Sequence, residues 1–275
     1  MIHGFICPIC RRQLVQIEKT LHCENGHCYD ISKKGYVNLM MSQSSAKKRH
    51  GDDKLMIKAR TDFLNLGLYA PLADAICEEL HKYADDAHVI IDAGCGEGYY
   101  SERIHKSFPE SDIYGIDISK DALYGAYKRD PSLMLCAAST SSIPLPDSCA
   151  DIVTSIFAPI FPIEFARLLG DNGILITAVP LKHHLFGLKQ LVYDNAYANP
   201  APKTELDGFT LILRKDIEYE ITLDNNESIR SLFMMTPYYY KTSRADQDKL
   251  SDVTRLTTQV GFAILIYKQA IPKLG

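Results

Sequence analysis

The sequence predicts an α/β protein in which helices cover a mostly parallel sheet, preceded by a small metal-binding module. Beyond residue 87, short apolar runs alternate with amphipathic segments, a pattern typical of parallel strands joined by helices. Several closely spaced Cys and His residues lie within the first 36 positions. A polar stretch over 42–54 indicates a linker. We therefore expect a metal-binding domain over 1–40, a basic linker over 41–54 and a larger α/β domain over 55–275.

Apolar periodicity predicts the elements of the larger region. The expected strands are 88–92, 112–117, 133–138, 151–157 and 173–179, with helices at about 98–108, 119–129 and 162–169. Two helices precede them, one with Leu55, Ala59, Phe63 and Leu66 at helical spacing and one opened by Pro71. Later in the chain we expect a long helix near 183–198, an antiparallel pair formed by 209–214 and 262–267, and mostly helical structure over 225–257.

Composition limits the class of protein. The 275 residues are 46% hydrophobic, enough for the core of one ordinary domain and a small module. The sequence contains no apolar run long enough to span a membrane, and its first residues lack the features of a signal peptide. We therefore expect a cytoplasmic protein. In that reducing compartment, closely spaced thiols among the eight cysteines favour metal binding over disulfides.

Charge is distributed unevenly along the chain. Residues 1–60 hold eleven Lys or Arg and five Asp or Glu, a net +6, whereas residues 61–275 hold nineteen and twenty-nine, a net −10. A basic segment on an acidic body suits docking to a polyanion such as RNA, because phosphate contacts supply most of the sequence-independent affinity. An unevenly charged, solvated surface is the alternative interpretation.

A zinc site is predicted near the N-terminus. Cys7-Pro-Ile-Cys10 is followed by Cys23-Glu-Asn-Gly-His27, which gives the spacing C-x2-C-x12-C-x3-H. Tetrahedral zinc prefers thiolate and imidazole ligands, and each short pair supplies two of them from one turn. Cys28 competes with His27 as the fourth ligand, because Cys23-x4-Cys28 is also sterically possible. A site with four protein ligands is closed, so we expect a structural role.

A glycine loop follows the first predicted strand of the larger domain. The run Val89–Ile91 ends in Asp92 and leads to Gly94-Cys95-Gly96-Glu97-Gly98 ahead of a helix. Glycines at such a turn let the backbone approach a ligand closely. A dinucleotide loop would need G-x-G-x-x-G, but Tyr99 follows Gly98. Glycines behind a carboxylate fit the loop of a class I, Rossmann-like S-adenosylmethionine-dependent methyltransferase, which predicts a methyltransferase domain over 55–275.

The ends of neighbouring strands complete the expected cofactor site. Asp92 would lie near the methionine end of S-adenosylmethionine. Asp117 ends the second strand, where a carboxylate could accept hydrogen bonds from both ribose hydroxyls. Ser139 closes the third strand, ahead of the segment 143–147 that would flank adenine. Cys95 lies inside the loop, where we expect it to pack against the backbone rather than to attack a substrate.

Further blocks accompany these motifs. They are Gly35–Leu39, Gly51–Asp52, Ala59–Arg60, Phe63–Leu64, Gly67–Leu72, Ile156–Pro159, Ile176–Pro180, His184–Leu185 and Met235–Pro237. Together with the zinc spacing and the glycine loop, they make the chain resemble the bacterial 23S ribosomal RNA guanine-N1 methyltransferases of the RlmA type. Generic methyltransferases share only the glycine loop, so the resemblance is specific, and it runs through nearly the whole length.

The resemblance implies methyl transfer from S-adenosylmethionine to N1 of one guanine in a hairpin of 23S ribosomal RNA. It also implies a zinc module that helps to hold the RNA, and a homodimer with a basic cleft. It favours His27 over Cys28 as the fourth zinc ligand, and it implies that Tyr69, Gly96, Glu97 and His183 contact the cofactor. Which of two neighbouring guanines is modified stays open.

The chemistry narrows the target further. Guanine N1 carries a proton at neutral pH, so a carboxylate or histidine could accept it, although no residue is assigned to this role. The fourth strand ends in Phe157-Ala158-Pro159, not in the Asn-Pro-Pro-Tyr of enzymes that act on exocyclic amines. The target base must leave its stack, and Tyr238, Tyr239 and Tyr240 are candidates to stack on it, the alternative being that they pack in the core.

Basic residues predict where the RNA would run. The expected track consists of Lys33, Lys34 and the segment Lys47–His50, with a solvated linker as the alternative. Two rival functions remain: a small-molecule methyltransferase, and a zinc-bearing RNA-binding protein whose methyltransferase fold is inactive. The basic zinc module argues against the first rival, and the intact glycine loop with Asp117 argues against the second.

Overall fold

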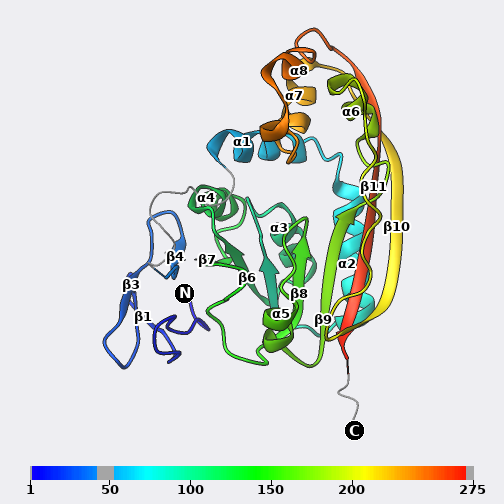
Figure 1. Cartoon of the computed structure of the whole chain (residues 1–275). Helices are drawn as coiled ribbons and strands as arrows, with labels where there is room; N and C mark the ends of the chain where they lie inside the picture. The colour runs from blue at the N-terminus through cyan, green and yellow to red at the C-terminus, as the bar shows by residue number, and fades with distance from the viewer. Residues whose placement is uncertain (1, 42–52, 271–275) are drawn as a thin grey trace.

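A central sheet of eight strands organises the chain (Figure 1). The computed structural model describes residues 2–41 and 53–270. The strand order is β10-β11-β9-β8-β5-β6-β7-β4, parallel from β9 to β4, with β10 and β11 antiparallel to their neighbours. The strands are β4 (Tyr36–Asn38), β5 (Val89–Ala93), β6 (Asp112–Asp117), β7 (Met134–Ala137), β8 (Ala150–Ile156), β9 (Leu169–Pro180), β10 (Phe209–Leu223) and β11 (Leu256–Gln269). The predicted parallel sheet and its antiparallel closing pair are confirmed.

Both faces of the central strands β5, β6, β7 and β8 are buried, which explains why these strands are almost continuously apolar. Successive residues alternate between the faces: Ile90 and Ile113 belong to one core, whereas Ile91 and Tyr114 belong to the other. The first core is closed by α2 (Ala70–Ala84), α3 (Tyr99–Ser107) and α4 (Lys120–Arg129), and the second by α5 (Pro162–Leu168) and part of the N-terminal region. Ser119 caps α4, since its hydroxyl accepts a hydrogen bond from the Ala122 amide.

Helices also lie over the carboxyl ends of the parallel strands (Figure 1). These are α1 (Lys54–Leu64) and α7 (Asn226–Met234), which pack against each other. Nearby are α6 (Phe186–Val192), the short 3-10 helix η1 (Tyr239–Lys241) and α8 (Arg244–Asp248). Cofactors of open α/β sheets bind at the carboxyl ends of the strands. The helices α1 and α7 therefore cover the expected cofactor site.

The zinc module packs directly on the sheet. It contains the small antiparallel sheet of β1 (Val15–Ile17), β2 (Thr20–His22) and β3 (Cys28–Asp30). Phe5 is fully buried and meets the ring of Tyr114 edge-on, with 5.4 Å between the ring centres. The Ile6 amide donates to the carbonyl of Pro144 at 2.9 Å. The module therefore shares its core with the central sheet.

The segment 36–39 belongs to the central sheet. It falls within the metal-binding domain predicted over 1–40, but its first three residues form β4, which pairs in parallel with β7 at the edge of the central sheet. Local spacing could not reveal this, because parallel pairing depends on a strand about one hundred positions away in the chain. The division of the chain at residues 40 and 55 stays a prediction.

Two helix predictions need correction. Leu55 and Leu66 were expected on the packed face of the first helix, but they are 59% and 51% exposed, because the buried face of α1 follows Met56 and Ile57 and the helix ends before Leu66. The long helix near 183–198 shrinks to α6, because Leu185 has a left-handed φ of 57° at its start and the chain leaves the helix at Tyr193. Over 225–257, helices alternate with turns.

Two further expectations concern the basic linker and membrane-spanning segments. The linker residues 42–52, which include Lys47, Lys48, Arg49 and His50, lie outside the described residues. Within 2–41 and 53–270, no helix combines the length and the apolar character that crossing a bilayer requires.

Candidate functional site

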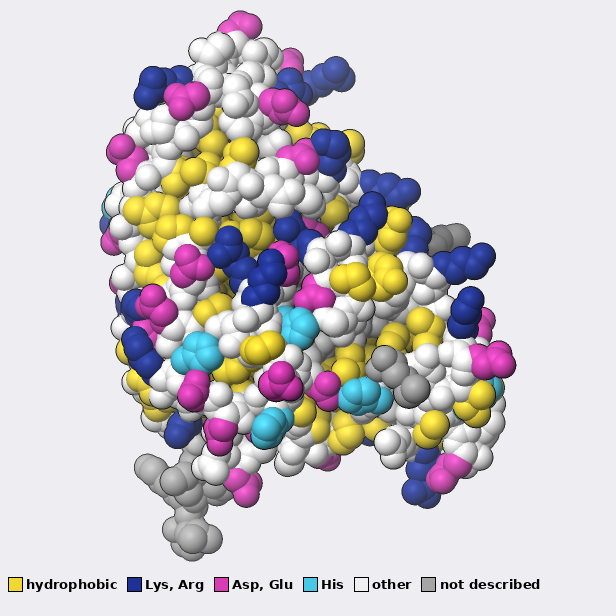
Figure 2. Space-filling view, turned by 180° about the vertical axis from the view of Figure 1, so that it is seen from behind, with side chains coloured by type: hydrophobic (Ala, Val, Ile, Leu, Met, Phe, Trp, Pro, Cys, Tyr) yellow, Lys and Arg dark blue, Asp and Glu magenta, His cyan; other side chains and the backbone are white. Residues whose placement is uncertain are grey.

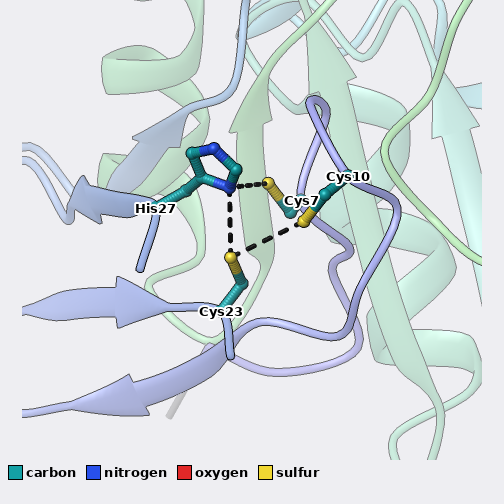
Figure 3. Close-up of side chains that lie close together, drawn as sticks. All are labelled: Cys7, Cys10, Cys23 and His27. Atoms are coloured by element: carbon teal, nitrogen blue, oxygen red, sulfur yellow. Dashed lines mark hydrogen bonds between the residues drawn. The ribbon is translucent and has the colours of Figure 1, made fainter. Parts of the chain in front are cut away.

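The four residues predicted to bind zinc converge at one point (Figure 3). Cys7 and Cys10 come from the turn before β1, and Cys23 and His27 come from the turn between β2 and β3. Their ligand atoms all lie within 4.8 Å of one another. The imidazole presents Nδ1 to the sulfur atoms of Cys7 and Cys23, at 3.5 Å and 3.3 Å. Two separate turns thus supply one ligand set.

These separations fit a tetrahedral zinc ion. Zn–S bonds of about 2.3 Å at tetrahedral angles place two sulfur atoms roughly 3.8 Å apart. The sulfur atoms of Cys10 and Cys23 are 3.7 Å apart. Cys28 is exposed, and its sulfur lies 3.1 Å from Nδ1 of His22 instead. The geometry therefore puts His27, and not Cys28, in the ligand set.

A tyrosine supports the ligand set from outside. The hydroxyl of Tyr29 lies 3.2 Å from the sulfur of Cys7. Burial acts to raise the pKa of Cys7, but hydrogen bonds from Tyr29 and from the backbone amides of Cys10 and Ile9 outweigh it and lower the pKa to about 6. A thiol that ionises readily is what zinc requires, because the metal binds the thiolate.

The second site is the glycine loop between β5 and α3. The amides of Gly94 and Cys95 both donate to the carbonyl of Ile116 in β6, at 2.8 Å and 3.1 Å. Gly94 has a φ of 90°, and a side chain there would collide with the Cβ of Ala158. Gly96 also has a positive φ of 56°, but a Cβ there would meet nothing closer than 3.7 Å. The loop is thus tightly packed at Gly94, whereas at Gly96 it meets only the end of the flexible Arg60 side chain, so a ligand can approach the backbone there.

Asp117 holds this loop from the end of β6. One of its oxygens accepts from the amide of Gly96 at 3.0 Å, and the other accepts from the amide of Ser119 at 2.7 Å. The carboxylate therefore fixes the loop and the start of α4 at the same time. Because it is half-buried at the carboxyl end of the strand, it keeps the position expected for a ribose contact.

Asp92 is buried beneath the loop. Its oxygens accept hydrogen bonds from the hydroxyls of Ser101 at 2.5 Å and Thr154 at 2.8 Å. Burial raises the pKa of Asp92, and the two hydroxyl donors counteract part of that rise. The side chain thus ties β5 to α3 and β8. A contact between Asp92 and the cofactor stays a prediction.

Two arginines missed by the sequence analysis surround Glu97. This glutamate is buried, and Arg129 of α4 donates to it at 3.2 Å. Burial raises the pKa of Glu97, while the charges of Arg129 and Arg60 oppose that rise. Arg129 also donates to the side chain of Asn65 at 3.0 Å, which joins the loop to the end of α1. Arg60 belongs to one of the blocks that carry the family resemblance, but only the fold shows that it lies beside Gly96.

Tyr69 lies in an aromatic cluster with a buried histidine. Its ring centre is 5.0 Å from that of Phe63 and 4.9 Å from that of Phe262. The amide of Gly261 donates to Nδ1 of His184 at 3.3 Å, so Nε2 carries the proton and faces the Tyr69 hydroxyl at 3.4 Å. Burial, and then the nearby charge of Lys189, lower the pKa of His184 to about 3. His184 is therefore neutral and structural.

The remaining predicted residues are less tightly held. His183 is exposed beside Phe186, in contrast to its neighbour His184. Ser139 is also exposed, and its hydroxyl lies 2.7 Å from that of Ser141. Both side chains are accessible at loops that follow strands of the sheet. Neither makes a described contact with the glycine loop.

Phe157 is a further residue that the sequence analysis did not assign to the site. It follows β8 with a left-handed φ of 55° and is 44% exposed. Its ring lies 6.2 Å from that of Tyr100, which follows the glycine loop, and 5.6 Å from that of Phe262. A bulky residue in this backbone region is strained by about 1–2 kcal/mol, and such strain is concentrated at functional sites.

The three consecutive tyrosines have partners within the chain. The hydroxyl of Tyr238 donates to Asn199 at 3.1 Å, and the ring of Tyr239 packs on Phe233 with 5.9 Å between centres. Tyr240 is 59% exposed and hydrogen-bonds to Asp53. At least two of these side chains serve packing, which matches the alternative interpretation of the run.

Comparisons with known proteins identify the family. Residues 5–48 match the zinc-ribbon family described as RlmA, N-terminal, and residues 84–221 match a methyltransferase domain. The YxjB protein of Bacillus subtilis (strain 168), whose name places it among the 23S rRNA (guanine-N(1)-)-methyltransferases, is 32% identical over 275 residues, or 95% of this chain and 96% of that protein. The chain belongs to this methyltransferase family.

A second relative by sequence agrees with this assignment. The 23S rRNA (guanine(748)-N(1))-methyltransferase of Streptomyces fradiae is 32% identical over 182 residues, which cover 65% of this chain and 64% of that protein. Among solved structures, geranyl diphosphate methyltransferase in complex with SAM aligns with a TM-score of 0.47 and 12% identity over 81% of this chain and 93% of that one. That structural likeness carries no information about the substrate.

As a member of the family, this methyltransferase uses S-adenosylmethionine and Zn²⁺. The zinc ion fits the three thiols and the imidazole by the distances given above. The cofactor fits the glycine loop, because among the described residues only the flexible Arg60 side chain comes within 4 Å of a Cβ placed on Gly96, and a carboxylate lies on the adjoining strand. Of the predicted cofactor residues, the structure brings Asp92, Gly94–Gly98 and Asp117 together. Tyr69 is linked to this group by ring contacts that run from Phe262 to Phe157 and then to Tyr100.

Proposed function

We propose that this enzyme transfers the methyl group of S-adenosylmethionine to N1 of a guanine in a hairpin of 23S ribosomal RNA. One observation carries the proposal: 32% identity extends through 95% of the chain to a protein named for this activity. The zinc cluster and the glycine loop, which lie far apart in the chain, are both intact within that match. A small-molecule methyltransferase would need no zinc module beside its sheet.

The cofactor would lie across the carboxyl ends of β5 and β6. Backbone amides of Gly94–Gly98 would follow it closely, and the Asp117 carboxylate would accept hydrogen bonds from the ribose hydroxyls. Arg60, which reaches over Gly96 from α1, would pair with the carboxylate of the methionine part. Ser139 would border the adenine. Tyr69 and His183 would complete the pocket, as the family resemblance implies.

The target guanine would meet Phe157. A base must leave its stack before its N1 can reach the methyl group, and an aromatic ring then replaces the lost stacking. Phe157 is partly exposed next to the glycine loop, so its ring can cover one face of the base while Tyr100 and Phe262 support it from behind. Transfer would form a bond between the methyl carbon and N1 as the carbon–sulfur bond breaks; sulfur would keep the electron pair of the broken bond, and the N1 proton would pass to solvent water.

The protein would act where ribosomal RNA is made and assembled, in the cytoplasm, and it would form a homodimer. Dimerisation rests on the family resemblance alone. It predicts a molecular mass of twice 30.9 kDa in sedimentation equilibrium.

A labelling experiment tests the proposed function. The protein is incubated with methyl-labelled S-adenosylmethionine and either unmodified 23S ribosomal RNA or a metabolite extract, and the labelled product is identified after nuclease digestion. The proposal predicts label in 1-methylguanosine from the RNA. Label in a metabolite with none in the RNA would replace it with a small-molecule activity, and no label anywhere would favour an inactive RNA-binding protein.

A further inference from the structure

A basic groove lies between α1 and α4, outside the proposed cofactor site. It has a volume of about 500 Å³ and opens to solvent. Lys54 and Lys58 line it from α1, Lys128 and Arg129 line it from α4, and Lys34 reaches it from the N-terminal region. In the view from behind, Lys and Arg side chains gather along the side of the molecule that carries the zinc module (Figure 2). The groove thus joins the zinc region to the methyltransferase domain.

Most of this positive charge has no ion-pair partner among the described residues. Two of the five cations are paired, Lys58 with Asp62 and Arg129 with Glu97. Among residues 2–41 and 53–270, no carboxylate lies within ion-pair distance of Lys34, Lys54 or Lys128. Asp121 is the other acidic residue on the lining. The groove therefore has three unpaired ammonium groups against one unpaired carboxylate.

Two of these lysines converge on one ring. The Nζ atoms of Lys34 and Lys128 lie 5.0 Å and 4.3 Å from the centre of the Tyr124 ring. Both charges therefore sit within about one Debye length of each other at 0.1 M salt, where like charges still repel. Cation–π attraction to the ring offsets part of this repulsion. An anion bound between the two ammonium groups would remove the remaining repulsion.

We propose that this α1–α4 groove binds a stretch of the RNA phosphate backbone, with Lys34, Lys54 and Lys128 as the phosphate contacts. Lysines act as point charges for phosphates and carry no sequence information, so this contact positions the RNA and does not select the base. The inference rests on the proposed function, because it assigns part of the ribosomal RNA to this surface.

The groove is also next to the cofactor loop. Arg129 lies in its wall, while the guanidinium of the same residue donates to Glu97 within the loop. A phosphate backbone in the groove would therefore run along α4, on the side of Arg129 that faces away from the cofactor loop. This arrangement places an RNA strand near the carboxyl ends of the sheet without occupying the cofactor pocket.

A pair of double variants tests the groove. Lys34→Ala/Lys128→Ala removes the two charges on Tyr124, and Lys203→Ala/Lys268→Ala removes two exposed lysines that do not line it. All four side chains are exposed, so both proteins should fold. Affinity for an unmodified 23S ribosomal RNA transcript is measured by fluorescence anisotropy from 50 to 200 mM KCl, and S-adenosylmethionine affinity is measured by calorimetry.

The groove variant should bind RNA roughly tenfold more weakly, and the slope of log affinity against log salt should become less steep by about 1.4 to 1.8, as expected for two lost phosphate contacts. Lys34→Arg/Lys128→Arg should restore the wild-type slope. Cofactor affinity should not change. Equal RNA affinities and slopes for the groove and control variants would overturn the proposal, and so would an equal loss of RNA and cofactor affinity.

The same preparations separate this inference from the proposed function. If the wild-type protein binds the RNA and methylates it, but the groove variant behaves like the control, only the groove assignment is wrong. If the wild-type protein binds the RNA through the groove but places no methyl group on it, the proposed function is wrong and the groove stands. If the wild-type protein does not bind the transcript, both are wrong.

Discussion

The zinc cluster and the glycine loop are both short turns with functional groups, but they are held together in opposite ways. In the cluster, Cys7, Cys10, Cys23 and His27 supply side chains that converge on one metal position. In the loop, the glycines shape the turn, the amides of Gly94, Cys95 and Gly96 donate to Ile116 and Asp117, and side chains of neighbouring elements hold the turn in place. The cluster therefore depends on its own side chains, whereas the loop depends on its surroundings.

This difference predicts where each site is vulnerable. The cluster should be sensitive to the identity of single ligands and to loss of the metal. The loop should be sensitive to added volume and to the loss of supporting carboxylates, even those that never touch the cofactor. Four experiments test these expectations, beginning with the largest effect.

Removal of one zinc ligand should give the largest change. Structural zinc sites in small peptides contribute of order 10 kcal/mol, so His27→Ala should lose its zinc during dialysis against a mild chelator. Cys28→Ala should keep one zinc per chain, because Cys28 points toward His22 and away from the cluster. Metal content by atomic emission decides between them. Zinc retained by His27→Ala but lost by Cys28→Ala would reverse the assignment of the fourth ligand.

Added volume in the loop should come next. Gly98 has a φ of 82°, and a Cβ there would come within 2.8 Å of the Ala126 backbone. Gly98→Ala should therefore lower the free energy of unfolding by about 3 kcal/mol, from overpacking and from left-handed strain together. Gly208→Ala is the matched control, since Gly208 has a φ of 76° but nothing within 4 Å.

Urea unfolding of the two glycine variants separates the causes. Gly208→Ala should lose about 1 kcal/mol from strain alone. An equal loss in both variants would mean that close packing between the loop and α4 contributes nothing.

Loss of the supporting carboxylate should weaken cofactor binding. Asp117→Ala removes the acceptor of two backbone amides and the proposed ribose contact, so S-adenosylmethionine affinity should fall about 30- to 100-fold, or about 2–3 kcal/mol. Asp112→Ala, at the opposite end of the same strand, should leave the affinity unchanged. Calorimetric titration measures the S-adenosylmethionine affinity of both variants. Equal affinities of the two variants would show that Asp117 is not part of the cofactor site.

The smallest effect should be a loss of folding stability in acid, caused by His184 in the aromatic cluster. Because the pKa of His184 is lowered to about 3, the unfolded chain binds one more proton than the folded chain between pH 3 and about 6.5. The stabilising contribution is complete above pH 6.5 and declines as the pH falls, by about 2 kcal/mol between pH 7 and pH 5.

Adjacent histidines provide the control for this pH dependence. Urea unfolding of His184→Gln should show a smaller loss of stability between pH 7 and pH 5 than the wild type does. His183→Gln should keep the wild-type loss, because His183 is exposed. If both variants followed the wild type, another group would be responsible for the acid sensitivity.

The same comparison explains how far sequence alone could go. The zinc ligands are identified by their spacing, because the four side chains lie within 21 positions and nothing distant is required. The central strands follow from apolar runs buried on both faces. The strand β4 and the groove between α1 and α4 could not be predicted, because they arise where segments distant in the chain meet.

The supporting residues of the loop were missed for a related reason. Arg129 and Thr154 lie 32 and 62 positions from their partners Glu97 and Asp92. No local pattern distinguishes such residues from ordinary helix and strand positions. Phe157 carried a weak signal, since it stands directly after a strand that ends at the cofactor edge, but its backbone strain and exposure are visible only in three dimensions.

The central claim is that the zinc region and the cofactor sheet form one enzyme for guanine N1 of 23S ribosomal RNA. Its most direct test is the mass spectrometry of 23S ribosomal RNA from host cells that lack the gene. The account predicts that one 1-methylguanosine disappears, returns with a plasmid copy of the wild-type gene, and does not return with Asp117→Ala. Unchanged 1-methylguanosine at every position in the deletion strain would contradict it.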